Sequence, residues 1–380
     1  MITIPKRVAD LLPYQSGKPI GQLARERHPK RIVKLASNEN PLGTSPLALK
    51  AIRENLDQLH RYVDPAAPEL VGAIAAKFQI RSEKIICGHG TDALLGYILN
   101  ALTQPGDEIL TSEGTFIGMY VNVNKFGRRL SLVPLKNYAF DLDRIHASIT
   151  DQSRAIYLTN PNNPTGTIFT KKEFDRFLSG VPENVLVILD EAYTEYAAFS
   201  QDYPDGLKYE RDNLIVLRTL SKTYGLAGLR VGFAVGPEYL IQQIYKVKLP
   251  FEPNYLAQKA ALAALEDSDF IQKTVETNRR SIKKMQTKFD SLGIRQVPTW
   301  ANFLMLLLPS EKMARDFFEE CLNFGLIVRN LNRFGIPPGI RINSGTDEET
   351  QFALEVIEKV WRKLNGSQNQ PEIISTKAAK

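Results

Sequence analysis

Short apolar runs rich in β-favouring residues recur from about residue 84 onward, with helical patterns between them. In chain order they read KIIC, EILT, LSLVPL, AIYLT, VLVILD, LIVLRT and VGFAVG. Runs this apolar, bounded by Gly, Pro, Asn and Asp, are typical of strands buried on both faces. The pattern therefore predicts an α/β fold in which helices sandwich a mostly parallel sheet.

The last two runs are too close together for a parallel connection. Only about ten residues separate them, and a parallel crossover usually needs a dozen or more. We therefore expect the strand after Arg230 to run antiparallel to its sequence neighbour, with Gly225 and Gly228 permitting the tight turn. Earlier in the chain, Thr170 and Glu173 have the spacing of a capping box and predict the start of a helix.

The chain changes character after about residue 255, where long helical patterns begin. A shorter succession of strands and helices follows them, typical of a smaller α+β domain. The predicted division is a large domain over residues 40–265 and a small C-terminal domain over 266–365. The N-terminal segment 1–39 is expected to contribute to the small domain, and 366–380 to form a disordered tail.

Composition narrows the classes of partner. A net charge of +6 and a pI near 9.0 favour an anionic partner. The Lys and Arg residues are scattered and no nucleic-acid-binding motif appears, which argues against nucleic acid. The two cysteines, Cys87 and Cys321, suggest a reducing compartment. With no apolar leader and no run long enough to span a bilayer, we expect a cytoplasmic protein without a membrane partner.

Polar residues follow several of the apolar runs, and ligands of open α/β sheets bind beyond the carboxyl ends of the strands. Gly90 and Thr91 open a helix after KIIC, where backbone N–H groups can bind phosphate. A glycine turn of this kind is more often only a turn. Asn163, in the rigid turn NPNNPTG, can present its amide to a ligand oxygen.

Two charged residues stand at the ends of otherwise apolar strands. Asp190 ends VLVILD, where a carboxylate needs a partner, either an Arg or Lys or the cationic ring nitrogen of a cofactor. Lys222 follows Thr219 and Ser221 and precedes Arg230 by eight residues. A lysine beside other cations has a depressed pKa and can attack a carbonyl. A phosphate cradle, an amide donor, a carboxylate and such a lysine are together what pyridoxal phosphate chemistry requires.

Five motifs carry a resemblance to a known family. They are PYQSGKP, NENPLG, NPNNPTG, DEAY and SKTYGLAGLRVGF, in this order. With them the chain, over about residues 8–365, resembles the fold-type-I pyridoxal phosphate aminotransferases, and among these it is most similar to members that act on histidinol phosphate. The resemblance implies pyridoxal 5'-phosphate as cofactor and a homodimer with shared active sites. It also implies an amino donor, which can be phosphorylated, and a 2-oxo acid acceptor such as 2-oxoglutarate.

The resemblance assigns a role to each matching residue. Lys222 resembles the Schiff-base lysine, and Asp190 the carboxylate that keeps the ring nitrogen protonated. Asn163 and Tyr193 resemble the pair that hydrogen-bonds the phenolic oxygen of the ring, and Phe116 the residue stacked on the ring. The implied phosphate cradle is Gly90, Thr91, Thr219, Ser221 and Arg230, with Tyr62 reaching the site of a neighbouring subunit. The implied substrate contacts are Arg341, Arg329, Tyr14 and Asn38.

The implied reaction is a ping-pong transamination in which Lys222 yields to the amino donor and then moves the proton between donor and cofactor. Two positions depart from the family pattern. Phe116 lacks the hydroxyl of the usual tyrosine, with Glu113 close by, and Asn343 and Ser344 follow Arg341 in place of more apolar residues. Because both departures touch substrate binding, two alternatives stay open. They are an aminotransferase for aromatic or other amino acids, and a threonine-phosphate decarboxylase on the same scaffold.

Overall fold

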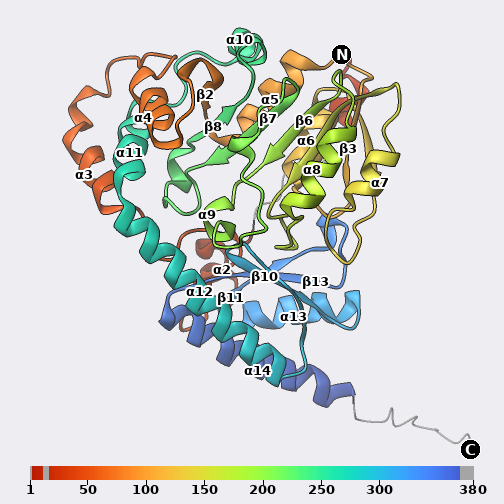
Figure 1. Ribbon diagram of the computed structural model, residues 1–380. Coiled ribbons are helices and arrows are strands. Elements are labelled where there is room, and N and C mark those ends of the chain that lie inside the picture. Colours follow the sequence, from red (N-terminus) through yellow and green to blue (C-terminus); the bar gives the residue numbers. More distant parts are fainter. Residues whose placement is uncertain (1, 12–16, 369–380) are drawn as a thin grey trace, which may run out of the picture.

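The protein is described by a computed structural model that covers residues 2–11 and 17–368 (Figure 1). Its main feature is a seven-stranded sheet with the strand order β2-β8-β7-β6-β5-β3-β4. The strands are β2 (Ile85–Gly88), β3 (Glu108–Ser112), β4 (Arg129–Val133), β5 (Ser153–Thr159), β6 (Leu186–Asp190), β7 (Leu214–Thr219) and β8 (Gly232–Val235). All seven coincide with the predicted apolar runs, which confirms the predicted α/β class.

Strand β8 is the antiparallel member of the sheet. It pairs antiparallel with both β2 and β7, and its register places Gly232 opposite Thr219, which confirms the predicted mixed sheet. The turn before it requires Gly225, whose φ is +69° and whose added Cβ would lie 2.1 Å from the Gly43 carbonyl oxygen. The expectation for Gly228 is wrong, because a Cβ there would meet nothing within 4 Å and its φ is not in the left-handed region.

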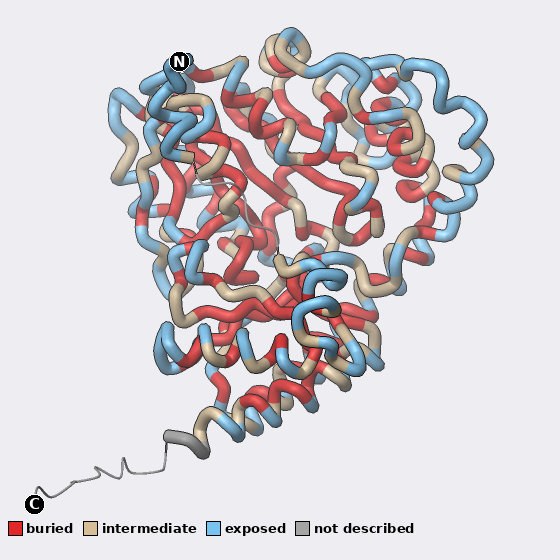
Figure 2. The backbone as a smooth tube through the Cα atoms, turned by 180° about the vertical axis from the view of Figure 1, so that it is seen from behind, coloured by how far each residue is buried: buried red, intermediate tan, exposed pale blue. Residues whose placement is uncertain are grey.

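Helices cover both faces of the sheet, because the strand side chains alternate between two apolar cores. On one face, Ile188 belongs to the core formed with α5 (Gly90–Leu102), α6 (Ile117–Lys125) and α10 (Glu238–Val247). On the other face, Val187 and Leu189 pack with α7 (Leu142–Ala147) and α8 (Lys171–Gly180). Figure 2 shows the sheet as the buried centre of this unit. Helix α8 begins with the predicted capping box of Thr170 and Glu173.

Further helices pack at the edge of the sheet and at the start of the chain. Residues of α4 (Pro68–Phe78) and α11 (Tyr255–Glu266) share an apolar core with β2 and β8. The remaining elements of this half are α1 (Lys6–Ala9), α3 (Pro46–Glu54) and α9 (Thr194–Ala197), and the 3-10 turns η1 (Leu56–Gln58), η2 (Ser82–Lys84), η3 (Gly206–Lys208) and η4 (Ala227–Leu229). Helix α2 (Ile20–Arg27) packs instead with the C-terminal part of the chain, where its Leu23 shares an apolar cluster with Leu322 and Ile327.

A second, antiparallel sheet of order β12-β13-β10-β9 lies below the first in Figure 1. Its strands and the helices around it are α12 (Ser268–Ser291), β9 (Arg295–Val297), β10 (Phe303–Leu307), α13 (Glu311–Asn323), β12 (Arg329–Asn330), η5 (Asn332–Phe334), β13 (Gly339–Asn343) and α14 (Asp347–Gln368). A strand of the N-terminal segment, β1 (Val33–Lys34), pairs parallel with β11 (Leu326–Ile327). The run IVRN (residues 327–330), which the sequence alone suggests as one strand, is divided between β11 and β12. The last helix continues to Gln368, into the stretch predicted as a tail, and residues 369–380 lie outside the described residues.

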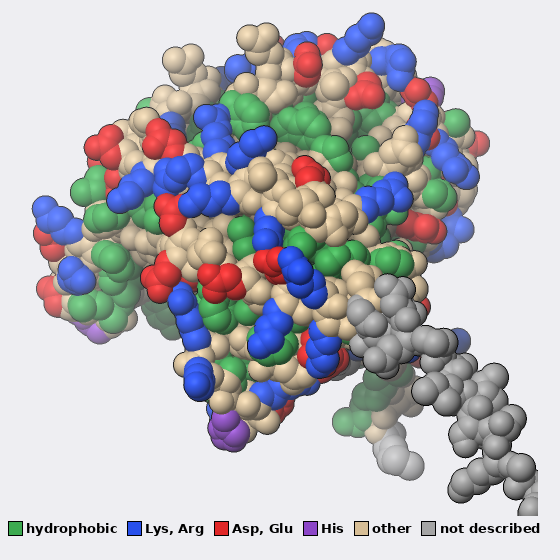
Figure 3. Space-filling view, turned by 90° about the horizontal axis from the view of Figure 1, so that it is seen from below, with side chains coloured by type: hydrophobic (Ala, Val, Ile, Leu, Met, Phe, Trp, Pro, Cys, Tyr) green, Lys and Arg blue, Asp and Glu red, His purple; other side chains and the backbone are tan. Residues whose placement is uncertain are grey.

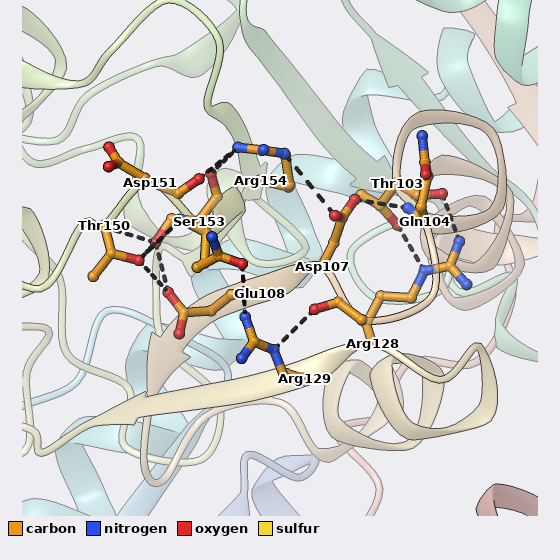
Figure 4. A network of polar contacts seen from close by, with 12 residues as sticks. Thr103, Gln104, Asp107, Glu108, Arg128, Arg129, Thr150, Asp151, Ser153 and Arg154 are labelled. Atoms are coloured by element: carbon orange, nitrogen blue, oxygen red, sulfur yellow. Dashed lines mark hydrogen bonds and ion pairs between the residues drawn. The ribbon is translucent and has the colours of Figure 1, made fainter.

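A polar network connects the starts of β3, β4 and β5, at the edge of the sheet opposite the carboxyl ends of the parallel strands (Figure 4). The buried Arg128 donates through Nε to Thr103 Oγ1 (2.8 Å) and through Nη2 to the Thr103 carbonyl (2.6 Å). Glu108, at the start of β3, accepts from Ser153 Oγ (2.7 Å) at the start of β5. This end of the sheet is therefore closed by structural contacts.

The described residues contain neither a membrane-spanning helix nor a metal-binding cluster. No helix among them is both long and apolar enough to cross a membrane. No group of three or more His, Cys, Asp and Glu side chains among them is arranged to hold a metal ion. Seen from below, Lys and Arg side chains are spread among Asp and Glu side chains (Figure 3).

Candidate active site

A cavity of about 300 Å³ lies at the carboxyl ends of the central strands, between the two sheets. The strands β5, β6 and β7 contribute Thr159, Asp190 and Thr219, the last residue of each. The second sheet contributes Arg329 and Arg341 from the opposite side. This is the position expected for a ligand in an open α/β sheet. Of the predicted site residues, those lining the cavity are Asn38, Thr91, Phe116, Asn163, Asp190, Tyr193, Thr219, Ser221, Lys222, Arg230, Arg329 and Arg341.

Lys222 lies in the turn after β7. Its Nζ is 3.5 Å from the Ser37 carbonyl oxygen and 5.9 Å from the centre of the Tyr193 ring. Burial and, after it, the positive charges of Arg341 and Arg230 together lower the pKa of Lys222 to about 8. A lysine with this pKa has a substantial unprotonated fraction near neutral pH, so it can act as a nucleophile or a base.

Asp190 is held by neutral hydrogen-bond donors. The Tyr157 hydroxyl donates to its Oδ2 (2.9 Å), and the Ala192 backbone N–H donates to its Oδ1 (3.1 Å). Burial raises the pKa of Asp190 to about 6, and both hydrogen bonds act against that rise. A buried carboxylate of this kind gains most from a cationic partner in the cavity. Tyr157 is not among the predicted site residues, although it is the one polar ring in the apolar run AIYLT and points to the same face of the sheet as Thr159 two residues on.

Asn163 connects the two sides of the cavity. Its side-chain oxygen accepts a hydrogen bond from Arg341 Nη1. The Nη2 of the same arginine donates to the Ala36 carbonyl (2.8 Å), and the side chain of Arg341 is almost fully buried. Elsewhere in the cavity lining, Asn38 Nδ2 donates a hydrogen bond to the Tyr193 hydroxyl (2.8 Å). Each of the four side chains is therefore fixed by contacts before any ligand enters.

The residues predicted to bind phosphate gather at the start of α5. Gly90 has a φ of +78°, and a Cβ added to it would lie 2.8 Å from Arg230 Nη2. The guanidinium of Arg230 therefore packs on the bare backbone of the helix start. Thr219 Oγ1 accepts from the Ser221 backbone N–H (3.1 Å), which orders the two hydroxyl-bearing residues of the turn. Backbone donors, hydroxyls and a guanidinium around one helix start form a site suited to a phosphate.

Other predicted residues have different surroundings. Arg329 lines the cavity with its guanidinium 5.6 Å from the centre of the Phe334 ring. Tyr62 is 84% exposed, stacks on Phe251 at 4.2 Å between ring centres, and is not part of the cavity lining of this single chain. Tyr14 lies outside the described residues.

The departures at Asn343 and Ser344 are both buried. Asn343 Oδ1 accepts a hydrogen bond from the Asn38 backbone N–H (3.1 Å). Asn343 therefore helps to hold the backbone of Asn38, a residue of the cavity lining, in place. The Ser344 backbone N–H donates to the Asn302 carbonyl (2.8 Å). Neither residue is part of the cavity lining.

A buried ion pair beside the site was also missed. Arg218 precedes Thr219 on β7, and Glu191 follows Asp190 after β6, so the pair joins the ends of neighbouring strands. Arg218 donates to Glu191 Oε2 through Nε (3.0 Å) and Nη2 (2.8 Å). The Arg218 Nη2 also lies 2.6 Å from Asp205 Oδ1. Two charge-assisted hydrogen bonds from one guanidinium at this position help to fix the spacing between Asp190 and Thr219.

The fold is that of the fold-type-I pyridoxal phosphate enzymes, as comparison with solved structures shows. The crystal structure of histidinol-phosphate aminotransferase from Sinorhizobium meliloti in complex with pyridoxal-5'-phosphate superposes with a TM-score of 0.88, at 27% identity, over 95% of this chain and 98% of that chain. Aspartate aminotransferase from Thermus thermophilus with maleate shares the fold, with a TM-score of 0.82 at 22% identity, over 95% of this chain and 100% of that chain.

The chain belongs to the class I and II aminotransferase family, whose sequence profile matches residues 30–357. Among curated proteins it is 40% identical to the histidinol-phosphate aminotransferase of Moorella thermoacetica over 364 residues, and these residues make up 94% of each chain. It is 41% identical over 363 residues to histidinol-phosphate aminotransferase 2 of Carboxydothermus hydrogenoformans, covering 93% of this chain and 100% of that one.

Proposed function

We propose that this chain is a pyridoxal phosphate-dependent aminotransferase that takes its amino group from histidinol phosphate and passes it to a 2-oxo acid such as 2-oxoglutarate. The observation that carries the proposal is the convergence of Lys222, Asp190 and most of the residues predicted to bind phosphate in one cavity. The names of relatives about 40% identical over nearly the whole chain support the choice of donor.

The residues present fit pyridoxal phosphate. Gly90, with Arg230 packed on it, leaves a cradle that a Cβ would fill, and Thr219 and Ser221 add hydroxyls beside it. Asp190, buried and hydrogen-bonded by the neutral donors Tyr157 and the Ala192 N–H, suits a protonated ring nitrogen. Asn163 and Tyr193 would hydrogen-bond the phenolic oxygen of the ring. The bound cofactor supplies an electron sink for the carbanion formed at the substrate Cα.

The side chains of this protein would do the remaining work. Lys222, with a pKa lowered to about 8, would accept the proton from the substrate Cα and return it on the cofactor side. Asp190 would keep a proton on the ring nitrogen, because a carboxylate in a buried site stabilises a cation strongly. The same site must accept a donor and then an acceptor in turn, so ping-pong kinetics are expected.

Arg341 and Arg329 are proposed to anchor the anionic end of the substrate. Arg341 is buried, and its guanidinium is held by Asn163 and the Ala36 carbonyl, so its orientation is set in advance. A fixed guanidinium binds phosphate or carboxylate through two parallel hydrogen bonds. The same two arginines would serve the phosphate of histidinol phosphate and the carboxylate of the 2-oxo acid.

Replacing Arg341 with lysine should weaken substrate binding more than it slows turnover. The lysine ammonium keeps the positive charge but lacks the two parallel N–H donors of the guanidinium. We therefore expect KM for histidinol phosphate to rise by about 10- to 100-fold. Steady-state kinetics measure this change. The matched control is Arg295→Lys, an exposed arginine on β9 of the same sheet, which should leave KM unchanged. An unaltered KM for Arg341→Lys would remove this residue from substrate binding.

We further propose a homodimer in the cytoplasm in which each subunit completes the site of the other. Tyr62 is exposed and stacked on Phe251. Close to these two in the sequence, Leu56, Leu59 and Leu249 are exposed as well. Several exposed large apolar side chains are typical of a surface covered in an assembly. Tyr62 would then reach the cofactor phosphate of the neighbouring subunit.

The experiment that tests the function is a two-substrate kinetic analysis with histidinol phosphate and 2-oxoglutarate. Parallel lines in double-reciprocal plots are expected for ping-pong exchange. Phenylalanine, tyrosine and threonine phosphate serve as competing donors, and carbon dioxide release is recorded with threonine phosphate. A higher kcat/KM for an aromatic amino acid, or release of carbon dioxide, would replace the proposed substrate with one of the alternatives.

A further inference from the structure

The ring of Phe116 enters the cavity from the start of α6. Phe116 is the N-cap residue of that helix, and its side chain makes no capping hydrogen bond. A tyrosine hydroxyl could anchor such a ring through a hydrogen bond, but a phenylalanine ring is positioned by packing alone. What packs around Phe116 therefore decides where the ring lies.

The backbone of Gly118 supports the ring. A Cβ added to Gly118 would lie 2.5 Å from Phe116 Cε1 and 2.8 Å from Asp92 Oδ1. The Phe116 ring and the Asp92 carboxylate therefore occupy the space that the side chain of any larger residue at position 118 would need. Asp92 belongs to the first turn of α5 and also lines the cavity. Gly118 is thus the point at which α5, α6 and the Phe116 ring meet.

Asn122 joins these groups by hydrogen bonds. Its Nδ2 donates to Asp92 Oδ1 (3.1 Å) and to the Gly118 carbonyl oxygen (2.9 Å). The side chain is 6% exposed, and a Cβ on Gly96 of α5 would lie 3.4 Å from its Oδ1, so it is closely enclosed. One buried amide therefore holds a carboxylate of α5 against the first turn of α6.

We propose that Asn122 is a positioning residue for the Phe116 ring. By tying Asp92 to the Gly118 carbonyl, it fixes the first turn of α6 and with it the ring that faces the cofactor. The proposal rests on the proposed function, since the ring would be stacked on pyridoxal phosphate. The chain would thereby replace the missing tyrosine hydroxyl with a packed clamp formed by Gly118, Asp92 and Asn122.

A double-mutant cycle of Asn122→Ala and Phe116→Leu tests the proposal. Two quantities are measured on full-length protein titrated with pyridoxal phosphate. They are the cofactor Kd and the circular dichroism of the cofactor band per mole bound, which reports ring orientation. Asn122→Ala should raise the cofactor Kd roughly tenfold, because the two buried hydrogen bonds that hold the ring in place are lost, and should change the band. In the Phe116→Leu background the same change should raise Kd by less than about twofold, because no aromatic ring remains to be positioned. An equal, additive effect in both backgrounds would overturn the proposal.

Gly118→Ala gives a second test that does not depend on Asn122. Its Cβ should push the ring toward the cavity and weaken cofactor binding at least as much, whereas Gly72→Ala, where a Cβ meets nothing within 4 Å, should not. Asn124→Ala, an exposed position of α6, is the control for Asn122. Cofactor binding by Gly118→Ala equal to that of the wild type would contradict the clamp. Absence of any cofactor band in the wild type would instead refute the proposed function.

Discussion

Lys222→Ala should abolish the covalent attachment of pyridoxal phosphate. The purified wild type is expected to show the visible absorbance of a lysine-linked cofactor, and borohydride should make that link permanent. The variant should lack both properties, because no other lysine is part of the cavity lining among the described residues. Transamination should fall by roughly 10⁴-fold or more, as when other enzymes lose their nucleophile.

The control for this variant is Lys172→Ala, an exposed lysine on α8. It should keep the absorbance and the activity of the wild type. A borohydride-reducible link that survives in Lys222→Ala would show that another amine holds the cofactor. The pH dependence gives a further check, since the unprotonated amine is the reactive form. Because the pKa of Lys222 is lowered to about 8, the rate of cofactor attachment should rise with pH through that value and then level off.

Asp190→Asn should separate cofactor binding from catalysis. The amide keeps the shape of the side chain and removes the negative charge, so the ring nitrogen would no longer be held protonated. Pyridoxal phosphate should still bind, because its phosphate contacts are unchanged, while kcat should fall by about 10²- to 10³-fold, the range seen when a charge-stabilising group is lost. Single-turnover kinetics with saturating donor measure the loss. A wild-type rate in Asp190→Asn would exclude this carboxylate from the mechanism.

Tyr157→Phe is the matched variant for Asp190. The Tyr157 hydroxyl donates to the carboxylate and lowers its pKa, so its removal should raise the pKa of Asp190. The ionised form would then be lost at a higher pH as the solution is acidified. The acidic limb of the kcat/KM profile should therefore move to higher pH, with a smaller effect on the plateau than Asp190→Asn has. A profile that does not move would show that the hydroxyl has no influence on this carboxylate.

The fold could be predicted from the sequence because parallel strands that are buried on both faces have continuous apolar sequences. All seven strands of the large sheet coincide with such runs, and the short connection before β8 predicted its antiparallel direction. Turn geometry was less accessible. Gly225 and Gly228 look alike in the sequence, but only Gly225 approaches the backbone of another segment, at the Gly43 carbonyl.

The candidate site was predictable where its residues follow strands, as Asp190 and Lys222 do. Residues that act through tertiary contacts carried no local signal. Tyr157 reads as an ordinary strand position until the pairing of β5 with β6 brings it to Asp190. Asp92 and Asn122 read as ordinary helix positions until α5 packs against α6. The substrate was hardest to predict, because a guanidinium such as that of Arg341 binds carboxylate and phosphate alike.

The most direct measurement of the central claim is a half-reaction without any acceptor. Histidinol phosphate is added to the cofactor-loaded protein and the visible absorbance is followed. We expect histidinol phosphate to abolish the band of the lysine-linked cofactor, and added 2-oxoglutarate to restore it. Lys222→Ala should show no such cycle. A band that histidinol phosphate leaves unchanged, while phenylalanine or threonine phosphate shifts it, would contradict the proposed donor.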